Sequence, residues 1–324
     1  MPNHRHYPGG MTSAPPGPGR RAHTVRARGL EPHPHERLTL DPGAWMPLAS
    51  AHIDRADALT AGHRARRGTG TRHPIDDFLY DYYGTKPALL RRWHPGPGVV
   101  LAPSPDGPAQ HGTWRWYTTD RDGSVSMDVD AFLADRGDTV RYVRTLLAAT
   151  ASRQAQTACF GLHEWAMVYH QDDTRRRHSL PLRLGRAGTD AVVDSHPIRC
   201  SHIDAYRFFT PDAIPLNREL LTRETQVEHE QPGCLHANMD LFKWASKLGP
   251  AVPGDLLLDC FALARDVRTL DMQASPYDVS SLGVDAIAIE TAAGKTEYVA
   301  QQRGYAERAA ALRGRLVDAC AVAT

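Results

Sequence analysis

The sequence lacks the patterns that mark secreted, membrane-spanning and nucleotide-binding proteins most directly. No run approaches the roughly 18 consecutive apolar residues of a membrane-spanning helix, and the amino terminus has no apolar stretch of the kind that a secretory signal needs. Walker, GxGxxG, GxSxG and HExxH motifs are absent. The five cysteines never form a CxxC pair, which argues against a disulfide framework or a zinc knuckle (Cys159, Cys200, Cys234, Cys260 and Cys320). We therefore expect a cytoplasmic protein with reduced, mostly buried thiols and no membrane contact.

Charge and composition divide the chain near residue 72. Residues 1–72 carry 11 arginines against 5 acidic residues, whereas residues 73–324 carry 27 basic residues against 32 acidic ones. Proline and glycine make up 18 of the first 72 residues, and Tyr7 and Trp45 are the only aromatic residues there. Such a segment buries too little apolar surface to offset the entropy that is lost on ordering. We expect a flexible arm over 1–72 and a single ordered catalytic domain over 73–324.

The pattern of the domain predicts a mainly helical α+β fold with a small antiparallel or mixed sheet. Apolar residues recur at helical spacing in several segments, and two extended segments flank a turn at Asp122-Gly123. Two further stretches have the composition of strands. The expected helices cover 75–82, 130–150, 153–170, 235–248, 255–272 with Asp255 as its N-cap, and 295–320, and the expected strands fall within 113–130, 180–209 and 285–291.

Histidines and carboxylates gather in the middle of the chain, where seven of the 17 histidines lie between residues 163 and 236. In the expected helix 235–248, His236 and Asp240 are one turn apart on a face that continues through Lys243. Such a pair can bind a divalent metal, or the aspartate can orient the imidazole for proton transfer. The alternative is a helix whose polar face meets solvent.

Three other segments offer candidate site residues. Glu164 lies in an apolar segment, where desolvation would raise its pKa toward that of a general acid or base, unless an arginine such as Arg199 pairs with it. His202 ends a predicted strand and is either a site residue or a satisfied core histidine. The tight turn SPYD can project Tyr277 and Asp278 into a cleft.

Six longer segments that together span about 72–313 carry a family resemblance. They are RHPIDDFLYDYYGTKPALLRRWHPG, CFGLHEWAMVYH, HPIRCSHIDAYRFFTPDA, EQPGCLHANMDLFKWASKL, LLLDCFALARDVRTLDMQASPYD and IETAAGKTEYVAQQR. On these segments the sequence resembles a family of actinobacterial proteins commonly labelled 3-methyladenine DNA glycosylase. The resemblance implies hydrolysis of the N-glycosidic bond to an alkylated purine, in DNA repair or self-resistance, with damaged DNA or a nucleoside as the substrate. Such an enzyme needs an extruded base, aromatic stacking and a carboxylate, and it requires no cofactor.

Under this hypothesis the candidate residues fall into two sets. The catalytic candidates are Glu164, Asp240, His236 and Asp278, and the substrate-binding candidates are Trp93, Trp165, Tyr277, Asn238 and Lys243. The excess of acidic over basic residues in 73–324 disfavours binding to a DNA duplex, because most of the affinity for a duplex comes from contacts between basic side chains and phosphates.

Two alternatives stay open. One is a metal-dependent enzyme of specialised metabolism that acts on a small molecule, with Fe, Mn or Zn held by some of His163, His202, His236 and Asp240. The other is a binding module for a base or metabolite that has no enzymatic activity.

Overall fold

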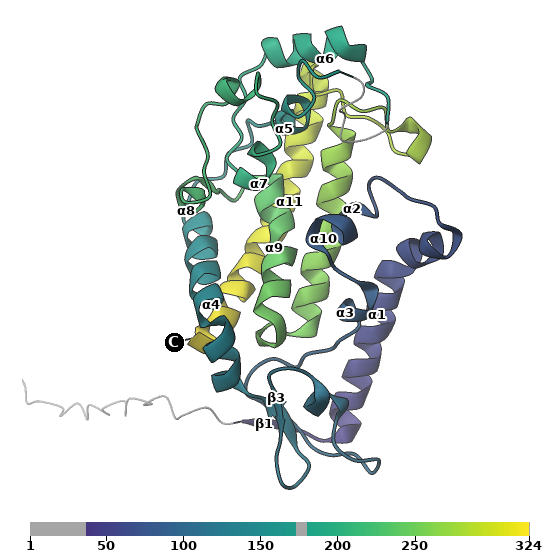
Figure 1. Cartoon of the computed structure of the whole chain (residues 1–324), viewed down its shortest axis with the longest axis vertical. Coiled ribbons are helices and arrows are strands. Elements are labelled where there is room, and N and C mark those ends of the chain that lie inside the picture. Colours follow the sequence, from purple (N-terminus) through teal and green to yellow (C-terminus); the bar gives the residue numbers. More distant parts are fainter. Residues whose placement is uncertain (1–36, 173–179, 324) are drawn as a thin grey trace, which may run out of the picture. The chain divides into compact units, whose positions relative to one another are not determined.

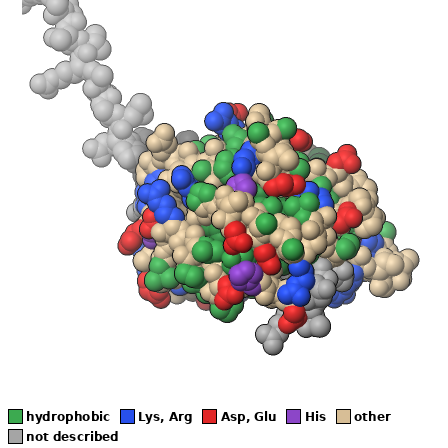
Figure 2. All heavy atoms as spheres, turned by 90° about the horizontal axis from the view of Figure 1, so that it is seen from above, with side chains coloured by type: hydrophobic (Ala, Val, Ile, Leu, Met, Phe, Trp, Pro, Cys, Tyr) green, Lys and Arg blue, Asp and Glu red, His purple; other side chains and the backbone are tan. Residues whose placement is uncertain are grey.

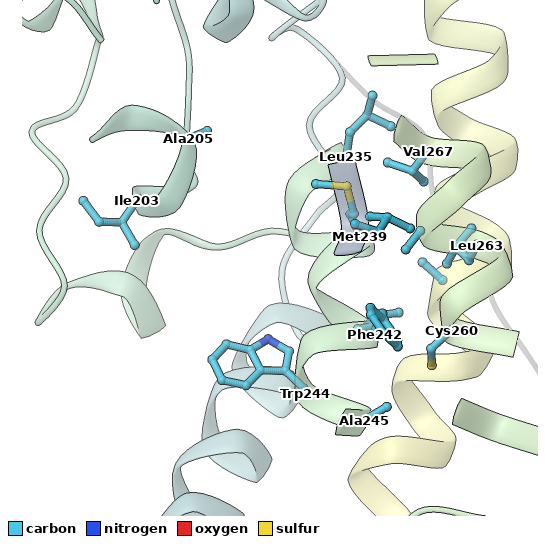
Figure 3. Close-up of a cluster of buried hydrophobic side chains, with 14 of the residues drawn as sticks. Ile203, Ala205, Leu235, Met239, Phe242, Trp244, Ala245, Cys260, Leu263 and Val267 are labelled. Atoms are coloured by element: carbon cyan, nitrogen blue, oxygen red, sulfur yellow. The ribbon is translucent and has the colours of Figure 1, made fainter. Parts of the chain in front are cut away.

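Four long helices form the core of the protein: α4 (Val129–Ala151), α9 (Leu235–Leu248), α10 (Gly254–Gln273) and α11 (Ala292–Ala319). The computed structural model describes residues 37–172 and 180–323, and in it these helices pack against one another (Figure 1). Leu235, Met239 and Phe242 of α9 lie against Leu263 and Val267 of α10 (Figure 3). The predicted mainly helical α+β fold is confirmed.

The first ordered elements begin earlier than the composition predicts. Residues 1–36 of the expected arm lie outside the described residues, but β1 (Leu38–Leu40) and α1 (Pro42–Thr69) occupy most of the remainder. The prediction of a flexible segment is therefore wrong for residues 38–69. α1 packs against α3 (Pro87–Leu90) and α10, and it buries Trp45, His52 and Ala56. The proline and glycine content was taken over all of residues 1–72, but 12 of these 18 residues precede residue 37. The low content after residue 37, which is compatible with a helix, was therefore missed.

A small mixed sheet forms beside α1. Its strand order is β1, β2 (Val99–Leu101), β4 (Val125–Met127), β3 (Tyr117–Thr119); β1 and β2 are parallel and the other pairs are antiparallel. The hairpin predicted at Asp122-Gly123 is present, and Gly123 adopts φ +85°, which favours glycine. The strands β1 and β2 were not predicted.

Three segments differ from the sequence prediction. No strand forms within the described part of 180–209; the chain instead forms α6 (Gly185–Asp194) and α7 (Ile203–Tyr206), with isolated bridges at Leu182 and Ile198. No strand forms over 285–291, and only Leu162–Ala166 (α5) is helical within 153–170. Short apolar runs do not distinguish a strand from a buried turn of helix, which explains the error over 180–209. Residues 285–291 and most of 153–170 instead form turns and irregular segments, several of whose apolar residues are buried without regular secondary structure.

Short helices complete the described structure, and none of its helices combines the length and apolar character that crossing a membrane requires. α10 starts after Pro253, so Asp255 lies in its first turn and pairs with Arg315 rather than capping the helix. The remaining α-helices are α2 (Phe78–Tyr83) and α8 (Gln226–His229), and the 3-10 helices are η1 (Gln110–Thr113), η2 (Ile214–Leu216), η3 (Gly249–Ala251), η4 (Ser280–Leu282) and η5 (Cys320–Ala323).

Asp77 ties the end of α1 to the segment that follows it. Its carboxylate accepts hydrogen bonds from Arg66 Nη2 at 2.7 Å and from the backbone N–H of His73 at 2.8 Å, and it lies 2.9 Å from His63 Nδ1. Burial raises the pKa of this carboxyl, but the partners outweigh burial and lower the pKa to about 2.

We expect the stabilisation by Asp77 to depend on pH. Because the folded-state pKa lies below the ordinary value of 3.8, the stabilisation is present above about pH 4 and is lost as the pH falls toward 2. The difference in Tm between wild type and Asp77→Asn should therefore be largest near neutral pH and shrink in acid. Asp81→Asn, at an exposed neighbour, should show little difference at any pH. A wild-type to Asp77→Asn difference that stays constant from pH 7 to pH 2 would contradict this account.

Candidate functional site

Three buried imidazoles lie side by side where α9 begins. The ring centroids of His163 and His236 are 4.5 Å apart, and those of His202 and His236 are 5.5 Å apart. His163 comes from α5, His202 precedes α7, and His236 lies in the first turn of α9. Asp240, one turn further along α9, is also buried and contacts His202. All four residues of the predicted metal set therefore lie close together. The alternative of a helix whose polar face meets solvent does not hold for His236 and Asp240, which are buried.

His163 belongs to a buried ionic network. Its Nε2 lies 2.7 Å from Asp271 Oδ1, and Arg268 Nη1 donates to Asp271 Oδ2 at 2.7 Å and to Glu164 Oε1 at 3.1 Å. Burial lowers the pKa of His163, but Asp271 outweighs burial and raises it well above its ordinary value. The predicted arginine partner of Glu164 is therefore Arg268 and not Arg199.

His202 has carboxylates on one side, and its ring nitrogens have no hydrogen bond within the described part of the chain. Its Nε2 lies 3.3 Å from Asp240 Oδ2 and 3.4 Å from Glu230 Oε1, which is within ion-pair range but without hydrogen-bond geometry, and its Nδ1 has no hydrogen-bond partner among the described residues. Asp240 instead accepts hydrogen bonds from Tyr83 Oη at 2.7 Å and from Lys243 Nζ at 2.9 Å. A fully buried imidazole without a hydrogen bond costs free energy unless another group binds it.

The network offers two groups of ligand atoms that each lie within 4.8 Å of one another. The groups are His163, Glu164, His236 and Asp271, and His202, Asp204 and Asp240. Including Glu230, five buried carboxylates face the buried Arg268 and the half-buried Lys243 in the described structure, and Arg207 and Arg223 reach Asp204 from the surface. The buried Arg313 is a further cation whose charge acts on Glu230. The raised pKa values of His163 and His202 favour protonated imidazoles, which add positive charge to the network, and a bound cation would do the same.

A cleft of about 710 Å³ opens next to Asp240. Two of its wall residues, Tyr83 and Lys243, bind Asp240 directly, and a third, Asp204, accepts a hydrogen bond from Lys243 at 2.6 Å. Arg223 and Lys243 outweigh burial and lower the pKa of Asp204 to about 2, so this carboxylate is ionised at neutral pH. The other lining residues are Tyr82, Asp138, Thr139, Tyr142, Arg207, Arg223, Gln226, Trp244 and Lys247.

Several residues predicted for a glycosylase site lie elsewhere. Trp165 is buried and donates its indole N–H to Ala274 O at 2.8 Å, and Tyr277 is also in the core. Asn238 is buried and its side-chain oxygen accepts a hydrogen bond from Arg313. The carboxylate of Asp278 accepts the backbone N–H of Ser280, and Trp93 packs on His111 near the small sheet. Of the substrate-binding candidates, only Lys243 lines the cleft.

Some members of the site were not selected from the sequence. Glu230 and Asp271 come from other parts of the chain than the histidines they face, and no local pattern links them. The cysteines do carry a local pattern that points to the site. Cys159, Cys200 and Cys234 precede His163, His202 and His236 by four, two and two positions, respectively.

Comparisons of the chain with protein-family models, curated proteins and solved structures find no match. What the site can do is therefore inferred from its own residues.

Proposed function

We propose that the chain is a metal-dependent enzyme that acts on a small molecule, with an ion held by some of His163, His202, His236 and Asp240. The convergence of these four residues in the interior carries this conclusion. The fully buried His202 adds to it, because neither ring nitrogen has a hydrogen bond among the described residues. Burial lowers the pKa of His202, but Glu230 and Asp240 outweigh burial and raise it, so its imidazole would bind an ion after losing a proton. Imidazole combined with carboxylate suits Fe(II), Mn(II) and Zn(II).

The surrounding residues support the roles that such a site needs. Asp271 accepts the Nε2 proton of His163, so loss of the proton on the other ring nitrogen would leave Nδ1 to bind an ion, an arrangement typical of metal-bound histidines. A bound ion would supply a Lewis acid and an activated water. Lys243 and Asp204 line the cleft and can bind and orient a polar substrate next to Asp240.

Elemental analysis of the purified full-length chain tests this proposal. We expect one or more equivalents of Fe, Mn or Zn, and we expect a chelator to lower Tm because binding to the folded state alone is stabilising. Affinity should fall as the pH falls, since the bound imidazoles must lose their protons. Protein that holds no metal after exposure to all three ions, with a Tm insensitive to chelators, would overturn the proposal.

A nucleobase N-glycosylase is the second candidate, and the cleft favours it. Tyr82, Tyr142 and Trp244 line the cleft and offer aromatic faces for a base, while ionised Asp204 can stabilise an oxocarbenium ion. On the face drawn in Figure 2, acidic and basic side chains of the described residues intermingle. A nucleoside or a short strand therefore suits this candidate better than a long duplex.

Release of 3-methyladenine from methylated DNA or nucleosides separates the two candidates. A glycosylase should release the base in the presence of a chelator and lose activity in Asp240→Asn and Asp204→Asn. The metal-dependent enzyme should show no chelator-resistant release. Binding of the free base without turnover, by protein that holds no metal, would instead indicate a binding module.

A further inference from the structure

The cleft beside Asp240 has a size and a wall that suit a small molecule with a flat ring. Its volume of about 710 Å³ lies within the range of roughly 300 to 1,000 Å³ that is usual for ligand sites. Three aromatic residues line it, namely Tyr82 of α2, Tyr142 of α4 and Trp244 of α9. Figure 3 shows Trp244 on the side of α9 that faces away from α10, and its ring meets that of Tyr142 edge-on at a centroid distance of 5.9 Å. Such faces pack well against the ring of a ligand.

Positive charge exceeds negative charge around this cleft. The basic residues of its lining are Arg207, Arg223, Lys243 and Lys247, and the acidic ones are Asp138 and Asp204. Asp138 is exposed and pairs with Arg141, which does not line the cleft. Asp240 lies just behind Lys243, which donates to it at 2.9 Å, and Glu230 lies deeper, where it faces His202. An anion is therefore attracted to the cleft more strongly than a cation of the same size.

The acidic group of the wall that lies nearest to the network is already paired. Asp204 accepts hydrogen bonds from Arg223 Nη2 at 2.5 Å and from Lys243 Nζ at 2.6 Å, and Arg207 Nε lies 3.4 Å from it. Gln226 Oε1 accepts a further hydrogen bond from Arg223 at 3.0 Å, which holds this guanidinium in place. A cation that entered the cleft would have to compete with these groups for Asp204, whereas an anion would not.

Lys247 is a cation of the lining that the protein itself leaves unpaired. Its side chain is exposed and has no ion pair or hydrogen bond within the described part of the chain. It follows Lys243 by four positions and Trp244 by three in α9, so all three side chains are neighbours on one side of the helix. A ring that lies on Trp244 and a negative charge that binds Lys247 can thus belong to one small molecule.

We propose that this cleft binds a small molecule that carries a carboxylate or a phosphate on a flat ring. Lys247 binds the anionic group, and Trp244 and Tyr142 contact the ring. Lys243 keeps its ion pairs with Asp204 and Asp240, and so shields the bound anion from their charge. The inference rests on the proposed function, because it takes the cleft as the substrate site of that enzyme, and it narrows the substrate from a polar molecule to an aromatic anion.

Isothermal titration calorimetry on the metal-free full-length protein tests this proposal with small probes. We expect benzoate or phenyl phosphate to bind about 10-fold or more tightly than benzyl alcohol, because a hydrogen bond to a charged group contributes more than a neutral one. Benzylamine should bind more weakly than either anion. Acetate and inorganic phosphate, which lack the ring, should bind more weakly than benzoate and phenyl phosphate, respectively. The tighter of the two aromatic anions identifies the anionic group.

Lys247→Gln removes the charge without removing a contact within the protein, so this variant should keep the wild-type Tm. Its affinity for the tighter aromatic anion should fall about 10-fold, and its affinity for benzyl alcohol should not change. Lys86→Gln is the matched control, because Lys86 is an exposed lysine that does not line the cleft. That variant should bind every probe as the wild type does.

Three outcomes would overturn the proposal: no aromatic anion binds, benzyl alcohol or benzylamine binds as tightly as both aromatic anions, or Lys247→Gln binds them as tightly as the wild type. Metal content tests the proposed function separately. Protein that holds a metal ion but binds no aromatic anion keeps the metal site and loses this inference. Protein that binds an aromatic anion through Lys247 but never holds a metal keeps the anion site and loses the metal-dependent function.

Discussion

Replacing His236 with alanine is expected to lower metal affinity by more than about 100-fold and to abolish any metal-dependent turnover. His236 lies between His163 and His202 and belongs to the group of ligand atoms that includes His163, Glu164 and Asp271, so an ion bound by that group would have it as a ligand. Burial and the neighbouring His163 lower its pKa to about 3, so it is the neutral ligand form at physiological pH. Because loss of an outer partner alone typically costs about 10 to 100-fold, loss of a direct ligand should cost more. Competition with a chromophoric chelator measures the change.

His111→Ala is the matched control for this variant. His111 is equally buried but lies by the small sheet, where its Nε2 is 2.8 Å from Trp93 O. Both truncations leave a cavity and should lower the free energy of unfolding by about 2 to 4 kcal/mol. Metal affinity should change only in His236→Ala. Equal metal affinity in the two variants would make His236 part of the scaffold.

Arg268→Met is expected to lower the free energy of unfolding by about 3 to 5 kcal/mol. The guanidinium is almost completely buried and binds both Glu164 and Asp271, and it lies 3.9 Å above the Phe78 ring. Methionine fills much of the same volume but leaves two buried carboxylates without this cation, which is far more costly than the loss of a surface pair. Denaturant titration of the metal-free protein measures the change.

Arg308→Met provides the comparison, since Arg308 forms an exposed ion pair with Asp266 on the surface. That ion pair should contribute less than about 1 kcal/mol to the free energy of unfolding. If the two variants lose the same stability, Glu164 and Asp271 are not ionised together in the folded protein, and the charge balance described for the network is incorrect.

The helices with strong periodicity could be predicted from the sequence. For their polar residues, the sequence predicted the spacing along the helix but not the burial. Helical spacing places His236 and Asp240 one turn apart, which α9 confirms. The spacing gives no means of knowing that α9 is covered on both sides, so that Asp240 meets His202 and Tyr83 rather than solvent. Burial of a polar face depends on which distant elements pack over it, and this information is not local.

The partners of the histidines illustrate the same limit. Asp271 follows His163 by 108 residues, and Arg268, which binds Asp271, also binds Glu164 from 104 residues away. The chain reaches this arrangement because α9 and α10 are joined by a short turn, which brings the start of one helix to the end of the other. Trp165 and Tyr277 were predicted to bind substrate because they are aromatic, but both side chains are buried and pack in the core.

Anomalous X-ray diffraction from crystals grown with Zn(II), recorded on both sides of the zinc absorption edge, tests the central claim most directly. The account predicts one strong anomalous peak inside the protein, within coordination distance of His163 and His236. Peaks confined to exposed groups, such as the surface pair of His170 and Asp212, with none at the buried imidazoles, would contradict it.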